Sequence, residues 1–349
     1  MRDYEGAAGA VESRLRAIRA SGDLSLALGP DADRELRELR RARGRDPDLR
    51  AAFALGWLHW HRQLTRPDGQ AGDDGRRAYA ELMPCFIRGL TPIPDGLFPD
   101  IAIGSEHEAA RLLHRAMTAH DEDAILAAAA LWRRIQAAVP QDAAEWPATM
   151  VMLCVALQGS FECTGHLADL DEAVDAGRRG ASAIPPGDGR RARLLMNVAA
   201  ALRTRFDHSP DGDRQYADEA IALCRQAIAA TAAGKRERAG MLSSLGAALR
   251  ARFERYRDDA DLAESVAVAR QALAEAKALD PDLPRYLANL AGALRARHAG
   301  DRAQHDLAEA VGLLRAALSR TPPRHPDHAA NCANLAAALW ARHEESAAA

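Results

Sequence analysis

The chain has 349 residues and a formal net charge of −3, and its five cysteines lie far apart with no CxxC pair. This nearly balanced charge excludes a general nucleic-acid binder, and the cysteine pattern excludes a disulfide or zinc framework. The sequence has no apolar signal segment and no apolar run near the roughly 20 residues that span a bilayer. We therefore expect a cytoplasmic, soluble protein without membrane or nucleic-acid partners.

The first part of the chain predicts helices with only a faint repeat. Residues 1–47 contain two polar helical segments, which we expect to cap the N-terminal end of the fold. Residues 48–145 are expected to form divergent helical repeats, and the Pro/Gly-rich stretch 84–102 is interpreted as a long connection. The densest aromatic segment, with Trp57, Trp60 and Arg62, is predicted to be a first helix because Arg62 falls where Arg252 does in a later repeat.

Residues 146–345 contain a regular repeat, and residues 346–349 are expected to be a disordered tail. Four segments align on central leucines at 202, 249, 294 and 339, so the steps are 47, 45 and 45 residues. Each repeat begins with leucines four residues apart, the core-facing stripe of a helix, and continues through a polar turn into a second helix.

The start of the second helix carries a recurring Asp-Leu-x-Glu motif, at Asp169, Asp261 and Asp306. We interpret this motif as a capping box, with Asp as the N-cap and Glu three residues later. Tyr216 replaces the aspartate in one repeat.

Together these patterns predict an all-α fold, a right-handed α-solenoid of stacked antiparallel helix hairpins with a period of about 45 residues. The segments L-G-x-x-L, R-A-R-F and T-P-P-x-H-P-D resemble the long tetratricopeptide-like (TPR-like) repeats of actinobacterial proteins, which often precede a caspase-like CHAT domain. The resemblance is good over about 145–345. The chain ends at ARHEESAAA without room for a CHAT domain, so no peptidase activity is carried over.

Two columns of polar residues recur on the first helices. One contains Asn197, Ser244, Asn289 and Asn334, about 140° from the leucine on a helical wheel. It is either a ladder of amides that grips a peptide backbone or a set of hydrogen bonds that fixes repeat stacking. The other contains Arg205, Arg252, Arg297 and Arg342, which point toward the apolar side. Those arginines either pair with the aspartate of the following turn or clamp a ligand carboxylate.

A further set, Arg203, Arg250 and Arg295, is interpreted as a solvated face. His59 and His61 cannot share a metal on one helix, and His107 with His114 is a weak pair, so we expect no metal and no cofactor. No phosphate loop, GxSxG or HExxH motif is present, which makes an enzyme the less favoured class.

We predict a protein–protein interaction scaffold that binds a peptide or protein segment in its concave groove. The candidate binding residues are the two columns above, together with Trp57, Trp60 and Arg62. An acidic partner is favoured because arginines select carboxylates. The alternatives are a sensor module that acts with a separately encoded effector such as a CHAT-type protease, and a pathway enzyme with a pocket in the groove. The oligomeric state is left open.

Overall fold

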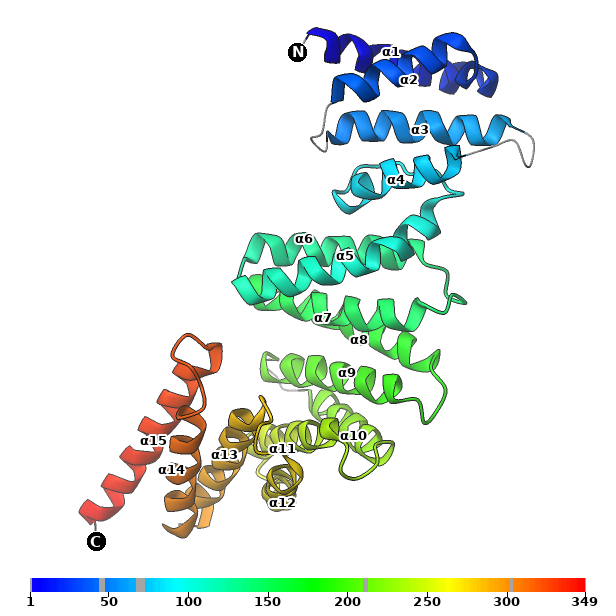
Figure 1. Ribbon diagram of the computed structural model, residues 1–349. Helices are drawn as coiled ribbons and strands as arrows, with labels where there is room; N and C mark the ends of the chain where they lie inside the picture. Colours follow the sequence, from blue (N-terminus) through cyan, green and yellow to red (C-terminus); the bar gives the residue numbers. More distant parts are fainter. Residues whose placement is uncertain (1, 44–47, 67–72, 210–212, 302–303, 349) are drawn as a thin grey trace. The chain divides into compact units, whose positions relative to one another are not determined.

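The computed structural model describes residues 2–43, 48–66, 73–209, 213–301 and 304–348. The regular structure of these residues is helical without any strand, which confirms the all-α prediction (Figure 1). No helix in this part of the chain is both long and apolar enough to cross a bilayer. The chain divides into two compact units, Met1–Cys163 and Thr164–Ala349.

The N-terminal unit is built from helices that pack on their neighbours in the chain. α1 packs on α2 and α3, α3 pairs with α4, and α5 pairs with α6. Val11, Ile18, Leu39 and Leu58 are buried where the first helices meet. The elements are α1 (Arg2–Ser21), a 3₁₀ turn η1 (Leu24–Ala27), α2 (Pro30–Arg43), α3 (Leu49–Thr65), α4 (Asp74–Ile87), α5 (Phe98–Ala119), α6 (Glu122–Ala138) and α7 (Trp146–Thr164).

The long connection expected over 84–102 is shorter than predicted. α4 continues through Pro84 to Ile87, and α5 begins at Phe98, so the irregular segment is 88–97. Ile93 and Leu97 are buried within it. The prediction from proline and glycine content made the connection too long, because it included the end of α4 and the start of α5.

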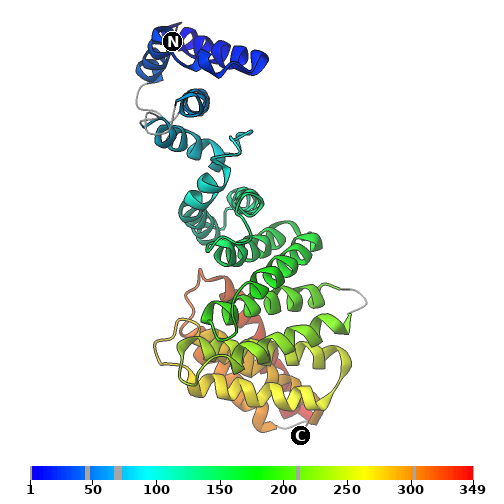
Figure 2. The same cartoon turned by 90° about the vertical axis from the view of Figure 1, so that its right-hand side faces the viewer.

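The C-terminal unit repeats one motif, a first helix paired with a second helix. The pairs are α9 with α10, α11 with α12, and α13 with α14, and the first helices α9, α11, α13 and α15 also contact one another in order. Figure 2 shows the helices of this unit, coloured from green to red. Its helices are α8 (Leu167–Ser182), α9 (Gly189–Asp207), α10 (Arg214–Ala229), α11 (Arg236–Tyr256), α12 (Asp259–Glu275), α13 (Leu283–Asp301), α14 (Gln304–Leu318) and α15 (Pro326–Ala348).

The predicted anchor leucines form the centre of this repeat. Leu202, Leu249 and Leu294 are fully buried, whereas Leu339 on α15 is only partly buried. The tail expected to be disordered over 346–349 is helical as far as Ala348, and Ala349 lies outside the described residues.

The predicted capping boxes are wrong. The N-cap of α12 is Asp258, whose side chain accepts from the Ala260 amide at 3.1 Å, and Asp261 lies inside the first turn. α8 is preceded by His166, so Asp169 also lies within its helix. Since a helix can start one turn before its most regular motif, spacing alone placed the start about three residues late.

The Asp-Leu-x-Glu motif instead holds helices together. Asp261 on α12 accepts from Arg252 on α11, with Nε to Oδ2 at 2.7 Å, and Asp306 on α14 accepts from Arg297 on α13 at 2.6 and 2.7 Å. Both aspartates are buried. Each aspartate thus closes its own hairpin through a charge-assisted bond to the first helix.

The glutamate of the motif connects successive hairpins. Arg178 pairs with Glu219 at 2.6 Å, Arg225 with Glu264 at 2.7 Å, and Arg270 with Glu309 at 2.8 Å. Each pair joins a second helix to the second helix of the next hairpin, so one motif specifies contacts both within and between repeats.

The repeat that lacks the aspartate keeps its arginine by another contact. Arg205 lies over the ring of Tyr216, 5.2 Å from its centroid, where Arg252 meets Asp261 in the next repeat. A cation–π contact therefore replaces the ion pair at this position.

Candidate functional site

The C-terminal unit contains a groove along its first helices. One hollow of about 510 Å³ lies between α11, α13 and α15, and a second of about 270 Å³ lies between α9, α11 and α13. Both are lined by Arg250 and Asn289, so they form one continuous feature, which we call the first-helix groove. A third hollow of about 570 Å³ meets it at Ser244 and Arg285, near the beginnings of α9 and α11.

The asparagine column lines these hollows and also joins neighbouring repeats. Asn289 donates from Nδ2 to Ser243 Oγ on α11 at 2.9 Å, and Asn334 accepts from Arg295 on α13 at 3.1 Å. Ser244 donates to the Gly240 carbonyl of its own helix at 3.0 Å. Asn197 lies in the third hollow. All four members of the column therefore line hollows, and two of them make the inter-repeat bonds that were the alternative interpretation.

The predicted arginine column lies outside the hollows. Arg252 and Arg297 point into the hairpins and bind Asp261 and Asp306. Arg205 bonds Asp171 on α8 at 3.0 Å, and Arg342 is exposed on α15. Arg205, Arg252 and Arg297 make the structural pairing that the sequence left as one of two interpretations, and none of the four arginines lines the first-helix groove.

The arginines interpreted as a solvated face line the groove instead. Arg250 and Arg295 line the first hollow, and Arg203 and Arg250 line the second. All three are half-buried. The helical wheel correctly placed these arginines away from the core. In the structure the first helix of the next repeat lies beside them, so they form one wall of the groove.

Two of these arginines form helical ion pairs with the carboxylate four residues later. Arg203 pairs with Asp207 at 2.6 Å, and Arg250 pairs with Glu254. Burial raises the pKa of Asp207, although Arg203 opposes this effect. Such i, i+4 pairs at a partly exposed surface contribute only about 0.3–0.5 kcal/mol, so a ligand can displace them.

Arg295 differs because its hydrogen bond goes to a neutral group. Its guanidinium donates to the amide oxygen of Asn334, and among the described residues no carboxylate lies within ion-pair distance. Burial lowers the pKa of Arg295, the nearby Arg250 lowers it further, and the Glu254 carboxylate in the same hollow opposes both effects. The groove therefore holds a partly desolvated cation that lacks a bonded anion.

Arg250 also has unused donor capacity at the centre of the groove. Its Nε atom is buried without a hydrogen-bond partner in the described part of the chain. Gly292 on α13 makes room for it, because a Cβ at that glycine would lie 3.3 Å from Arg250 Nε. A small residue at 292 keeps this guanidinium extended across the groove wall.

The aromatic candidates of the N-terminal unit contact the connection between α4 and α5. Trp57 donates from its indole nitrogen to the Pro92 carbonyl at 3.1 Å. A Cβ on Gly96 would lie 2.8 Å from the Trp60 ring, so that ring lies against the connection. Both tryptophans are half-buried and hold the irregular segment against α3.

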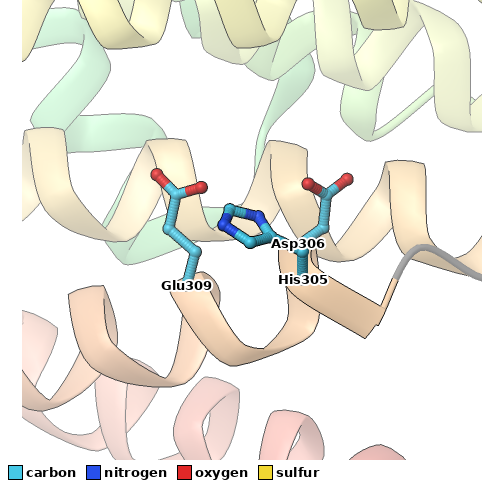
Figure 3. A group of neighbouring side chains, drawn as sticks. All are labelled: His305, Asp306 and Glu309. Carbon is cyan, nitrogen blue, oxygen red and sulfur yellow. The ribbon is translucent and has the colours of Figure 1, made fainter.

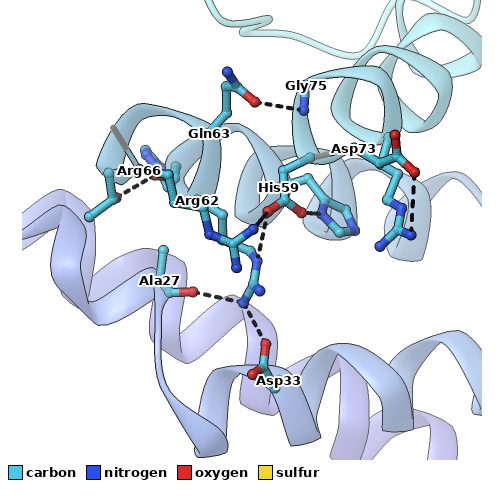
Figure 4. Close-up of polar contacts among 12 residues, drawn as sticks. Ala27, Asp33, His59, Arg62, Gln63, Arg66, Asp73 and Gly75 are labelled. Atoms are coloured by element: carbon cyan, nitrogen blue, oxygen red, sulfur yellow. Dashed lines mark hydrogen bonds and ion pairs between the residues drawn. The ribbon is translucent and has the colours of Figure 1, made fainter. Parts of the chain in front are cut away.

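Arg62 belongs to a buried polar network rather than to a binding surface (Figure 4). Its guanidinium bonds Asp33 at 2.8 Å, the Ala27 carbonyl at 3.2 Å and Asp74 at 3.3 Å. Arg62 therefore connects α3 to α2, to η1 and to α4.

His59 completes this network in its neutral form. Arg40 donates to His59 Nε2 at 2.9 Å, so the ring proton lies on Nδ1, which donates to Asp74 at 2.6 Å. Burial lowers the pKa of His59 to about 4, against the opposing effect of Asp74. The Nε2 atom is occupied by Arg40, so this His–Asp pair has no free base to activate a nucleophile.

His305, Asp306 and Glu309 form the only cluster of three metal-ligand types found in the described residues (Figure 3). Asp306 is held by Arg297 and Glu309 by Arg270. A cation would have to displace two guanidinium groups, so the chemistry of this cluster is that of ion pairing.

The cysteine near the groove is not activated. Cys224 lines the second hollow, is buried, and has a pKa raised to about 12 by that burial. A thiol at this pKa is almost entirely protonated near neutral pH and is a poor nucleophile.

Comparison with known proteins gives structural neighbours only. No protein-family model matches the chain, and no curated protein matches it. The TPR-like repeats attributed to a Podosopora anserina kinesin light chain share 16% identity at a TM-score of 0.44, covering 59% of this chain and 93% of theirs. A variant of that protein shares 18% identity at a TM-score of 0.43, covering 64% and 97%. The TPR domain of P58(IPK) shares 12% identity at a TM-score of 0.27, covering 96% and 99%.

Proposed function

We propose that this chain is a protein-interaction scaffold whose first-helix groove binds an acidic peptide or protein segment. The observation that carries this proposal is Arg295, a half-buried arginine in the groove whose guanidinium donates to the neutral Asn334 amide. A carboxylate from a ligand would give this guanidinium a directly bonded anion, which Glu254 in the same hollow, paired with Arg250, does not provide.

The other arginine columns of the same repeats differ from Arg295, because their guanidinium groups bind carboxylates of the fold itself. Arg252 and Arg297 bind buried aspartates, and Arg225 and Arg270 bind glutamates of the next hairpin. Those columns already have structural partners. The groove column has two weak pairs along its own helices and one neutral partner, so it is the column with capacity for an external anion.

The polar groups beside these arginines fit a peptide backbone. Asn289 and Asn334 place amide groups in the same hollow as Arg250 and Arg295. An amide both donates and accepts, so it can pair with peptide N–H and C=O groups whatever the side chains are. The arginines then select for acidic residues.

The sequence leaves two other functions open. A sensor module that acts with a separate effector, such as a CHAT-type protease, would use the same groove and would differ only in its partner. A pathway enzyme needs an enclosed pocket with a convergent acid, base or nucleophile. The groove instead presents half-exposed arginines and amides, together with an unactivated thiol at Cys224.

The test compares groove arginines with matched arginines elsewhere in the same repeats. Arg250→Ala and Arg295→Ala are combined in one protein, and Arg225→Ala and Arg270→Ala in the control. Both are titrated with a library of short Asp/Glu-rich peptides and with the same peptides carrying Asn/Gln. We expect the native chain to bind acidic members only, and more weakly as salt is raised.

The groove variant should lose about tenfold or more in affinity, and the control should bind as the native chain does. Equal losses in both variants would show that net charge, not the groove, drives binding. No preference for acidic over amide peptides would contradict the proposal.

A further inference from the structure

The third hollow of the C-terminal unit has the size of a small-molecule site. Its volume is about 570 Å³, within the roughly 300–1,000 Å³ of pockets that hold small ligands. Residues of α9, of α11 and of the turn between α10 and α11 line it, together with Arg285 of α13. On α11 the lining extends from Lys235 to Ser244, about 14 Å at 1.5 Å per residue. The hollow is therefore long enough for an elongated ligand.

One wall of the third hollow is apolar. Met196 on α9 is half-buried, and Met241 on α11 is 7% exposed. The Thr231 hydroxyl donates to Met241 Sδ at 3.5 Å, which fixes one end of this thioether. A Cβ on Gly189 would meet no atom within 4 Å, so the start of α9 leaves open space beside the two methionines. Unbranched, polarizable methionine side chains adapt to an apolar chain laid along them.

Cations from three first helices also line the third hollow. Arg193 on α9 and Lys235 on α11 are exposed, and no carboxylate in the described part of the chain pairs with either. Arg285 on α13 is half-buried and lies 3.6 Å from Asp282. Glu237 is the one carboxylate among the lining residues. The hollow therefore has an excess of positive charge.

The start of α11 adds to this positive potential. Its N-cap is Lys235, whose side chain makes no capping bond. The neighbouring helices α10 and α12 begin with Asp213 and Asp258, whose carboxylates accept from backbone amides. The first amides of α11 thus have no side-chain acceptor, and the positive end of the helix dipole lies at the hollow.

We propose that the third hollow binds a small organic acid with an unbranched apolar chain. Its carboxylate lies among Arg193, Lys235 and Arg285, and its chain lies along Met196 and Met241. Cations alone would accept any anion, and an apolar wall alone would accept any apolar molecule, so the two together select a molecule that is both. This site is distinct from the peptide site, because Arg250 and Arg295 do not line it.

Saturated carboxylates are the probes for this site. Hexanoate, octanoate and decanoate are titrated below micelle-forming concentrations into the full chain, labelled with ¹³C at the methyl groups of its seven methionines. The resonances of Met196 and Met241, assigned with Met→Leu variants, should shift saturably, whereas those of Met150 and Met152 on α7 should not. Each added methylene should tighten binding by up to about fourfold. Decanol should bind about tenfold or more weakly than decanoate.

Paired variants test the role of the cations. Arg193→Ala combined with Lys235→Ala should weaken decanoate binding about tenfold or more. Arg190→Ala combined with Arg236→Ala is the control, because these exposed arginines lie at the starts of the same helices and do not line the hollow. The control should bind decanoate as the native chain does.

A second pair of variants tests the space itself. Gly189→Phe places a ring in the hollow and should abolish decanoate binding. Gly312→Phe on α14 makes the same change at another helical glycine with open space around its Cβ position, and should bind normally. Circular dichroism verifies that both variants keep their helices. The groove variant with Arg250→Ala and Arg295→Ala should also bind decanoate normally.

Four results would overturn the proposal. The first is no saturable shift of Met196 and Met241. The second is one affinity for all chain lengths, or equal losses in the two paired arginine and lysine variants, since general charge attraction would then explain binding. The third is decanoate binding that Gly189→Phe leaves intact. The fourth is a shift of both methionines by the acidic peptides but not by decanoate, because the hollow would then belong to the peptide groove.

Discussion

Removing the carboxylate of Asp261 tests how the hairpins are held. Asp261 is 3% exposed and binds Arg252 through two oxygens, and Arg252 also reaches Asp218 on α10. Breaking a buried pair from one side costs about 3–5 kcal/mol. Arg252 keeps Asp218 and is 14% exposed on its side chain, so we expect Asp261→Ala to cost about 2–3 kcal/mol, below that range.

The matched control is Asp258→Ala, the same substitution at the N-cap of the same helix. The Asp258 side chain is exposed and bonds one backbone amide, so its loss should cost about 1 kcal/mol. Urea unfolding followed by far-ultraviolet circular dichroism measures both, with equal m-values required for the comparison.

A double-mutant cycle with Arg252→Ala isolates the pair. Once Asp261 is already alanine, Arg252→Ala should cost only what its remaining bond to Asp218 contributes, because Arg252 and Asp261 act together. The reasoning is refuted if Asp261→Ala costs only about 1 kcal/mol and Asp258→Ala costs nothing measurable, since Asp261 would then be the cap that the sequence indicated.

Three further predictions follow from particular contacts. Gly56→Ala should destabilise the chain by about 1–3 kcal/mol in the same urea assay, because the new Cβ would lie 2.5 Å from Leu82 Cγ; an unchanged midpoint would show that α4 moves aside without cost. His59 is neutral in the fold and its pKa is lowered to about 4, below the roughly 6.5 of an unfolded histidine, so stability should fall as the pH drops from about 6.5 to 4. His59→Gln should make the stability less dependent on pH in this range. If the variant lost stability in acid as steeply as the native chain, His59 would not be the group responsible. Cys332 is exposed whereas burial raises the pKa of Cys154 and Cys224 to about 12, so iodoacetamide near pH 8 should modify Cys332 in the native chain and spare the other two; rapid loss of Cys224 by mass spectrometry would contradict the buried position.

The sequence predicted the repeat well because core burial recurs in every hairpin. Leu202, Leu249 and Leu294 are buried as their spacing requires. The helix starts were less predictable: Asp258 and Asp261 are both good N-cap residues, and only the path of the preceding turn decides between them.

The groove was harder to predict for a geometric reason. A helical wheel gives the angle of Arg250 from its own core, but it does not show whether the next repeat's first helix lies over that flank. The structure shows α13 there, with Gly292 against the guanidinium. Arg252 was easier, since the aspartate that neutralises it recurs nine residues later with Arg297 and Asp306.

We propose that the ligand lies along the first helices, and photocrosslinking can locate it there. p-Benzoylphenylalanine replaces Ala337, an exposed residue of α15 in the first-helix groove, or Ala308, an exposed residue of the second helix α14. With the tightest acidic peptide of the library, Ala337→p-benzoylphenylalanine should give a covalent adduct that unlabelled peptide competes away. A competed adduct from position 308, with none from position 337, would contradict the account.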